Sequence, residues 1–115
     1  MAYVSRTPKP PYYAAIFTSI NAGVDHTEHY STTDRMLELA SQYDGFLGIE
    51  PARNQDGTGV AVSYWRDLET IRDWARDPEH RQAKKKGREV WYDHYMIRIA
   101  RVERAYGRPD HDPDG

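Results

Sequence analysis

Apolar and polar positions along the chain change their period several times, and each change marks a predicted element. Residues 12–20 (YYAAIFTSI) are β-branched and aromatic, which is typical of a strand. Residues 31–34 (STTD) then supply candidate helix N-caps. The apolar residues that follow recur at i, i+3, i+4 and i+7, the spacing of one helical stripe: Met36, Leu39, Ala40 and Tyr43. The first part of the chain therefore predicts a strand followed by a helix.

The second part predicts a hairpin, a broken helix and a last strand. Residues 46–50 and 60–65 read as antiparallel strands around the turn at 54–59, whose Asp-Gly pair favours a hairpin. Asp67 is a candidate N-cap, and Asp77-Pro78 restarts the helix, which is predicted to continue through Trp91. A fourth strand alternates Tyr95, Ile97 and Ile99 with Met96, Arg98 and Ala100. The order β-α-β-β-α-β predicts an α+β, ferredoxin-like domain with a four-stranded antiparallel sheet.

The chain of 115 residues is short enough for one domain. We expect the folded part to span residues 12–106. Residues 1–11, with three prolines, are predicted to form a flexible N-terminal arm. Residues 107–115, rich in proline and aspartate, are predicted to be disordered.

The strands carry apolar side chains on both faces, whereas helices of a ferredoxin-like domain cover only one face. Val60, Val62 and Tyr64 alternate with Ala61 and Trp65. Monomers rarely leave a large apolar patch open to water. The pattern therefore predicts a homodimer that pairs through the open sheet face.

Charge and composition remove several classes of function. A formal net charge of −2 gives no reason to expect nucleic acid or a membrane as a partner. The basic run at residues 84–88 is read as a solvated helix face, with an anion site as the alternative. The absence of cysteine excludes disulfides, thiolate catalysis and zinc sites with sulfur ligands. Residues 1–11 lack a signal-peptide core and no run is long enough to span a bilayer, so we expect a cytoplasmic protein.

Four collinear segments resemble the antibiotic-biosynthesis-monooxygenase (ABM) domain family. Residues 43–50 (YDGFLGIE) are similar to the family's second-strand pattern, and residues 62–74 (VSYWRDLETIRDW) to its strand-to-helix segment. Residues 77–83 (DPEHRQA) resemble its helix continuation, and residues 88–95 extend the match toward the last strand. The resemblance implies a dimeric α+β barrel.

The resemblance also implies a range of activities. The leading hypothesis is a cofactor-independent monooxygenase acting on a small aromatic or enolic metabolite, with no bound cofactor and no metal. Such an enzyme needs a base, donors for the developing anion and an aromatic enclosure that excludes water. The alternative is a non-catalytic dimeric barrel protein that binds a hydrophobic metabolite or serves a stress or regulatory role, since fold alone does not fix function.

The candidate catalytic residues are His80, Trp65 and Trp74, and the candidate substrate-binding residues are Asn21, Tyr64, Tyr92 and His94. His80 resembles the family's recurrent helix histidine, and the two tryptophans its recurrent tryptophans. Each residue also has a structural interpretation: core packing for the tryptophans, a local hydrogen bond for His80, a turn for Asn21, an interface for Tyr92 and His94. Arg53, just before the hairpin, is read as a solvated edge residue.

Haem degradation and metal binding are weaker alternatives. The haem-degrading subgroup has a ligating histidine about ten residues beyond its helix tryptophan, but here that position is Lys84, and His80 lies only six beyond Trp74. The departure removes the expected iron ligand. His26 and His29 with His80 or His94 could be imagined as a metal site, yet the first pair lies in a polar loop. Ser19 and Ser63 lack the motif of an activated nucleophile.

Overall fold

One four-stranded antiparallel sheet organises the chain in this computed structural model, which describes residues 4–21 and 27–108. The elements in chain order are β1 (Tyr12–Asn21), α1 (Thr27–Ala40), β2 (Phe46–Arg53), β3 (Thr58–Trp65), α2 (Leu68–Arg76), α3 (Pro78–Lys86), the π-helical turn η1 (Gly87–Trp91) and β4 (Tyr92–Val102). The strands lie in the order β2-β3-β1-β4. The predicted ferredoxin-like α+β fold is confirmed.

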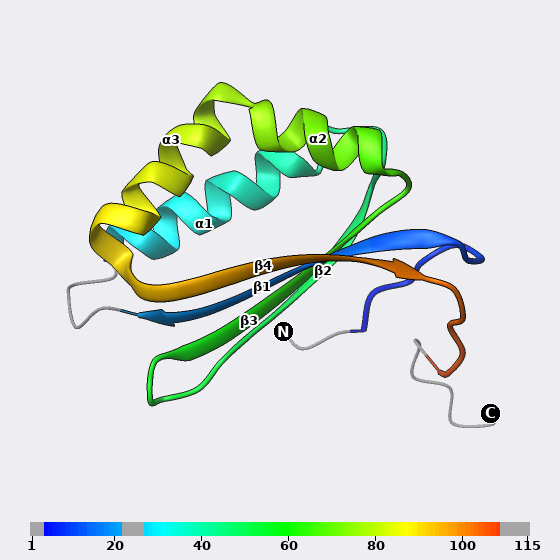
Figure 1. The fold of residues 1–115 in the computed structure, drawn as a ribbon, viewed down its shortest axis with the longest axis horizontal. Coiled ribbons are helices and arrows are strands. Elements are labelled where there is room, and N and C mark those ends of the chain that lie inside the picture. Colours follow the sequence, from blue (N-terminus) through cyan, green and yellow to red (C-terminus); the bar gives the residue numbers. More distant parts are fainter. Residues whose placement is uncertain (1–3, 22–26, 109–115) are drawn as a thin grey trace.

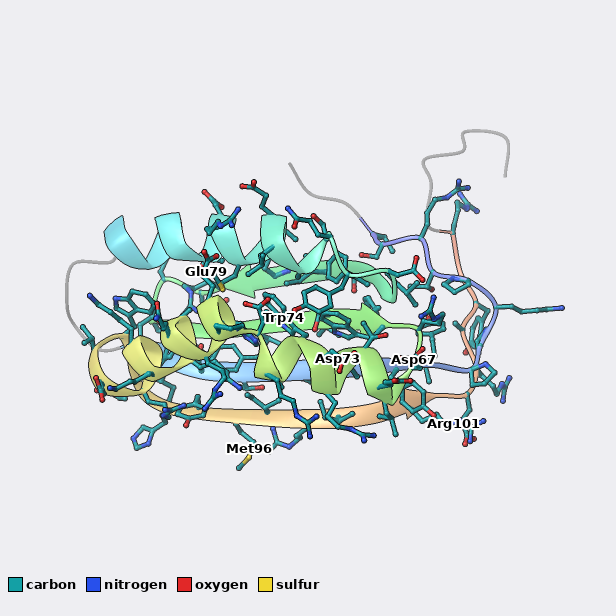
Figure 2. The ribbon with its side chains drawn as sticks, turned by 90° about the horizontal axis from the view of Figure 1, so that it is seen from above. Asp67, Asp73, Trp74, Glu79, Met96 and Arg101 are labelled. Atoms are coloured by element: carbon teal, nitrogen blue, oxygen red, sulfur yellow. The ribbon has the colours of Figure 1, made fainter. Side chains whose placement is uncertain are left out.

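The helices form a single layer on one side of the sheet (Figure 1). Figure 2, which views the molecule from above this layer, shows β4 at the edge of the sheet that the helices leave uncovered. Its side chains on the helix side are about half exposed: Tyr95 at 43%, Ile97 at 47% and Ile99 at 46%. The helix layer therefore covers the sheet only in part.

Local signals placed the helix starts of the second half correctly. The Asp67 side chain accepts a hydrogen bond from the backbone N–H of Thr70 at the start of α2. Asp77 does the same for Glu79 and His80 at the start of α3, where Pro78 occupies the first turn. The predicted break between the two helices at Asp77 is confirmed.

Several element boundaries differ from the predictions. Helix α1 ends at Ala40, so that Tyr43 of its predicted stripe lies in the following loop, and β2 continues to Arg53. Helix α1 begins at Thr27, four residues before the first predicted cap, because a helix can extend through polar residues that carry no apolar periodicity. The regular helix ends at Lys86, and residues 87–91 form a π-helical turn instead. A Cβ on Gly87 would lie 2.9 Å from the ring of Tyr92, so this turn needs a glycine. Strand β4 consequently starts at Tyr92 rather than at Tyr95.

Strand register assigns every strand residue to one face of the sheet. Trp65 of β3 stands opposite Tyr13 of β1 and stacks on α2, which puts their row on the helix side. Because side chains alternate along a strand, Ala15, Phe17, Ser19 and Asn21 also face the helices. Tyr12, Ala14, Ile16, Thr18 and Ile20 face the opposite side, which we call the open face.

The N-terminal arm lies against one end of the open face (Figure 1). The backbone N–H of Ser5 donates to the Glu50 carboxylate at 2.8 Å, and the Thr7 hydroxyl donates to the Tyr12 hydroxyl at 2.8 Å. Ser5 sits over Gly48, where a Cβ would lie 2.9 Å from its Oγ. Tyr12 and Ala14 are thereby only 4% and 5% exposed. Of the tail predicted to be disordered, residues 107–115, all but the first two lie outside the described residues.

Candidate functional site

A stack of aromatic rings joins the sheet to the helix layer. Phe46 packs edge-on against Trp65, whose ring centroid lies 5.2 Å away, and Trp65 is only 1% exposed. Trp65 stacks on Trp74 of α2 at 6.2 Å, and Trp74 in turn stacks on His80 of α3 at 3.9 Å with planes 12° apart. From above, Trp74 lies between α1 and the α2–α3 pair (Figure 2). The structure therefore brings together the three residues predicted as catalytic.

The His80 ring has a defined tautomer. Its Nδ1 lies 2.9 Å from the backbone carbonyl oxygen of Trp74. A carbonyl only accepts, so Nδ1 carries the proton and Nε2 is the acceptor of the neutral ring. Burial lowers the pKa of His80 below its usual 6.5, partly opposed by the hydrogen bond to Trp74. At neutral pH the residue is consequently a neutral imidazole whose Nε2 can accept a proton.

Asp77 fixes the position of this histidine. Its Oδ1 accepts the backbone N–H of His80 at 3.2 Å, and its Oδ2 accepts the Tyr43 hydroxyl at 2.7 Å. The hydrogen bond to Asp77 raises the pKa of Tyr43 to about 12 and, from the other side, lowers the pKa of Asp77. Tyr43 also packs edge-on against Trp74 at 5.5 Å. A single network thus holds the stack from the α1–β2 loop to α3.

Asn21 and Tyr92 lie together at the far end of the helix side. They face each other across β1 and β4, next to a register shift. The Oδ1 atom of Asn21 is buried and has no hydrogen-bond partner within residues 4–21 and 27–108. Burial raises the pKa of Tyr92, partly opposed by the charge of Arg53, and the ring packs edge-on against Phe17 at 5.2 Å. These two candidates therefore belong to a second group, at the opposite end of β1 from Trp65.

The residues between the two groups are small. Ala15 on β1 and Ala61 and Ser63 on β3 face the helices and are half-buried. The Ser63 hydroxyl accepts the Trp65 indole N–H at 2.8 Å, which orients that ring. The helix-facing surface of the sheet between the aromatic stack and Asn21 thus includes several small side chains.

Tyr64 and His94 do not share this side of the sheet. Tyr64 stands opposite Ala14 and His94 opposite Ile20, so both lie on the open face. The Tyr64 hydroxyl donates to the Glu50 carboxylate under the N-terminal arm, and burial followed by this bond raises the pKa of Tyr64 to about 12. His94 is exposed. The alternation that separates these residues from Trp65 was already visible in the strands, but the sequence did not tell which face meets the helices.

Arg53 and Ser19 were missed as members of the second group. Arg53 crosses β3 at Gly59 and reaches Ser19 on β1, with Nη2 3.4 Å from the buried Ser19 Oγ. Its Nη1 donates to the Gly57 carbonyl at 2.8 Å. The hairpin turn predicts the pairing of Arg53 with Gly59, and a glycine opposite an arginine was the signal that could have found it.

The basic run follows α3 along its outer side. Arg81, Lys85 and Arg88 border a shallow, open depression of about 350 Å³ with Pro78 and Gln82. Lys84 turns away from it and donates to the Ala75 carbonyl at 3.3 Å; burial lowers its pKa. The residue at the spacing of a haem ligand thus contacts the end of α2.

The described residues carry neither a cluster of metal ligands nor a membrane-spanning helix. Within residues 4–21 and 27–108, no three side chains of the ligand types His, Asp and Glu lie close enough together to hold a metal ion. His26 and the side chain of His29 fall outside the described part. None of the described helices is both long and apolar enough to cross a membrane.

Comparisons with known proteins give the family. Residues 17–109 match the family described as Monooxygenase af470-like. The chain is 47% identical over 104 residues to the uncharacterized protein YqjZ of Bacillus subtilis strain 168, covering 90% of each chain. Because this relative is uncharacterized, the match shows a family relationship but indicates no activity.

Solved structures show the same fold at low identity. The cofactor-independent oxygenase SnoaB of Streptomyces nogalater superposes with a TM-score of 0.72 and 15% identity, over 84% of this chain and 98% of its own. An antibiotic biosynthesis monooxygenase superposes with a TM-score of 0.67 and 10% identity, over 76% and 95% of the two chains. The resemblance to ABM domains drawn from the four sequence segments is confirmed, and the chain belongs to the af470-like monooxygenase family.

Proposed function

We propose that this protein is a cofactor-independent monooxygenase that oxidises a small aromatic or enolic metabolite between the helix layer and the sheet. One observation carries the proposal: His80 is a half-buried neutral imidazole whose Nδ1–H is bonded to the Trp74 carbonyl, which leaves Nε2 as its acceptor. In the described part of the chain, Nε2 has no hydrogen-bond partner. A positioned base of this kind is what cofactor-free oxygen chemistry requires.

The proposed reaction begins with proton transfer to Nε2. Removing the proton from an activated methylene or a phenol gives a delocalised carbanion, which can pass an electron to O₂ and then combine with it. For a methylene group, collapse of the resulting hydroperoxide forms a carbonyl and releases one water, so one oxygen atom enters the product and the other leaves with both hydrogens. The substrate supplies all the electrons, and the protein supplies the base and the enclosure.

The surroundings of His80 favour a flat apolar substrate. Trp74, half-buried and stacked on both His80 and Trp65, gives the base an aromatic surrounding, and edge-on ring contacts stabilise a bound aromatic compound. The sheet surface that faces the helix layer beyond the stack carries the small side chains of Ala15, Ala61 and Ser63. The exclusion of water around a developing anion strengthens its interactions with nearby donors.

A second copy of the chain is proposed to cover the rest of the open face. The N-terminal arm shields only the Tyr12 end. The other end exposes Ile20 at 42%, Val60 at 38% and Met96 at 53%, on three adjacent strands. A two-fold pairing buries the same patch on both copies, which fits this surface.

Oxygen consumption tests the proposed activity. We would measure uptake with an oxygen electrode on a panel of substituted hydroquinones and anthrones, comparing the wild type with His80→Asn. Asparagine keeps a donor near the Trp74 carbonyl but has no base at the Nε2 position. We expect uptake by the wild type on at least one compound and a loss of about 100-fold or more in the variant. His94→Asn, on the open face, is the matched control and should retain the rate.

Four outcomes would overturn the proposal or replace it. Uptake that does not exceed the rate without protein, on every compound, removes the oxygenase function. Equal uptake by His80→Asn removes the base. Binding of a compound without uptake supports the non-catalytic alternative instead. A titration with haemin should leave the Soret band at the position of free haemin; a shifted band lost in His80→Asn would favour haem chemistry.

A further inference from the structure

A row of residues crosses all four strands near the far end of the helix side. Strand pairing aligns Arg53 on β2, Gly59 on β3, Ser19 on β1 and Tyr95 on β4. A Cβ on Gly59 would lie 2.5 Å from Cζ of Arg53. The guanidinium therefore lies flat across β3 because Gly59 has no side chain there.

The Arg53 guanidinium has hydrogen-bond donors that no described residue uses. It donates to the Gly57 carbonyl and, more weakly, to Ser19 Oγ. A guanidinium carries five N–H donors, so most of them remain for another acceptor. Among the described residues no carboxylate lies within ion-pair distance of Arg53, whereas Arg35 and Arg66 each have one or more. A cation on this side of the sheet is thus available to an anion.

An unsatisfied acceptor lies beside this cation. The Gly57 carbonyl that accepts from Arg53 Nη1 also accepts the backbone N–H of Asn21 at 3.0 Å, so the two residues meet at one oxygen atom. The Asn21 Oδ1 is buried, and no donor among the described residues reaches it. Buried polar atoms are rarely left without a partner, and such exceptions call for an explanation. A ligand that carries a hydroxyl donor next to an anionic oxygen would satisfy both groups at once.

We propose that Arg53, Ser19 and Asn21 anchor an ortho-hydroxy aromatic carboxylate or its enolic equivalent. The carboxylate pairs with the Arg53 guanidinium, and the neighbouring hydroxyl donates to Asn21 Oδ1. Phe17 and Tyr92, packed edge-on to each other, form the adjacent aromatic wall. This inference deepens the proposed function, because it gives the substrate an acidic end held away from His80.

Arginine is suited to this role by its geometry as well as its charge. A planar guanidinium can donate two parallel hydrogen bonds to a carboxylate, and such pairs fix the orientation of the ligand. The Arg53 guanidinium already donates to the Gly57 carbonyl and to Ser19 Oγ. These contacts reduce the side-chain conformational entropy that Arg53 would lose when a ligand binds. A neutral amide of the same shape lacks the charge and should bind less tightly.

Binding measured without turnover tests this anchor. We would titrate the ¹⁵N-labelled protein with 2-hydroxybenzoate, 2-hydroxybenzamide and benzoate, following amide chemical shifts. We expect 2-hydroxybenzoate to bind about tenfold or more tightly than its neutral amide, the difference that a charge-assisted pair commonly makes. Benzoate, which lacks the hydroxyl for Asn21, should fall between them or bind as weakly as the amide.

Three variants distinguish the effect of the Arg53 charge from the effect of the position of its guanidinium. Arg53→Gln removes the cation, and Gly59→Ala displaces the guanidinium while keeping its charge; both should abolish the preference for the carboxylate. Arg72→Gln, an exposed arginine on α2, makes the same change in net charge and should leave the preference intact. A circular-dichroism melt of each variant checks that it is folded.

The titrations and the oxygen-uptake assay test the anchor and the oxygenase function separately. A missing preference for the carboxylate in the wild type, including no binding of any probe at millimolar concentration, overturns the anchor. A preference that survives Arg53→Gln also overturns it. Carboxylate binding without oxygen uptake would leave the anchor in place and remove only the oxygenase function, whereas oxygen uptake indifferent to Arg53→Gln would do the reverse.

Discussion

His80 is bonded to the same residue on which its ring is stacked: its Nδ1 lies 2.9 Å from the Trp74 carbonyl oxygen, and its ring centroid lies 3.9 Å from the Trp74 ring. The two contacts fix both the plane and the rotation of the imidazole. Because the proton sits on Nδ1, the basic nitrogen is defined before a substrate arrives. An ordinary helix-capping sequence, Asp77-Pro78-Glu79-His80, thereby places a base beside an aromatic face.

The rate of oxygen uptake should fall on the acid side of neutrality. The base works only as neutral imidazole, and burial lowers the pKa of His80 below 6.5. The rate is therefore expected to stay level around pH 7 and to decline as the pH falls through this lowered pKa. A pH–rate profile together with ¹⁵N spectra of the imidazole measures both quantities. An acid limb centred above 6.5 would contradict the assignment.

The same pKa shift bears on stability. A histidine whose pKa is lowered by folding binds its proton more readily in the unfolded chain, so protonation favours unfolding. The free energy of unfolding should consequently decrease as the pH falls below 6.5. Urea titrations of the wild type and His80→Asn at pH 7 and pH 5 should show a smaller decrease in the variant; equal decreases would assign the acid sensitivity to other groups.

Removing the cap of α2 should destabilise the fold by a modest amount. Asp67 accepts hydrogen bonds from the backbone N–H and the hydroxyl of Thr70, at 2.8 and 2.6 Å. We expect Asp67→Ala to lower the free energy of unfolding by about 1 kcal/mol in urea titrations. Asp73→Ala on the same helix (Figure 2) removes a carboxylate without a cap and should have little effect.

Acid should reproduce part of the effect of Asp67→Ala. The hydrogen bonds from Thr70 lower the pKa of Asp67 from 3.8 to about 2. A depressed carboxyl pKa contributes stability above 3.8, and this contribution is lost as the pH falls toward 2. The difference in stability between wild type and Asp67→Ala should shrink over this interval. A constant difference would contradict the origin of the shift in the cap.

Truncating the central tryptophan should cost far more than losing a cap. Trp65 is 1% exposed and contacts both Phe46 and Trp74. We expect Trp65→Ala to destabilise the protein by about 3–5 kcal/mol, measured by urea or thermal unfolding, because it leaves a cavity between sheet and helices. Tyr106→Ala, at a side chain 91% exposed, is the control and should stay within about 0.5 kcal/mol of wild type.

A charge on the open face should separate the proposed dimer. Met96 is 53% exposed on this face, and burying an unpaired carboxylate there is costly. We expect Met96→Glu to shift the mass measured by light scattering from two chains to one. Leu68→Glu, at a side chain 44% exposed on α2, introduces the same charge on the other side and should remain dimeric. A monomeric wild type would contradict the pairing.

Local patterns accounted for the elements with local causes. The hairpin at Asp56-Gly57, the caps at Asp67 and Asp77 and the order of the elements along the chain were all predicted, because each depends on residues close in the chain. The early start of α1 and the π-helical turn at residues 87–91 were not. The turn depends on Gly87 packing against the ring of Tyr92, a contact that the hydrophobic periodicity of the sequence does not predict.

The candidate site was likewise predicted only in part. Residue types and their resemblance to a family singled out His80, Trp65 and Trp74, which the structure brings into one stack. Tyr64 and His94 were grouped with them by type, but they lie on the open face. Arg53 was read as a solvated edge residue, and it does lie exposed on the edge strand β2, but its contact with Ser19 across Gly59 was not predicted.

The sequence by itself determined the element order, the caps and the family, since these follow from short-range propensities and collinear motifs. Only the tertiary structure decided which sheet face meets the helices. The alternation of side chains along a strand divides its residues between two faces, but it does not show which face the helices cover. The tertiary structure also decided that Asp77 and the Trp74 carbonyl fix the His80 ring, and that Arg53 reaches Ser19 across Gly59. These contacts join residues through packing and strand register, and no local pattern contains that information.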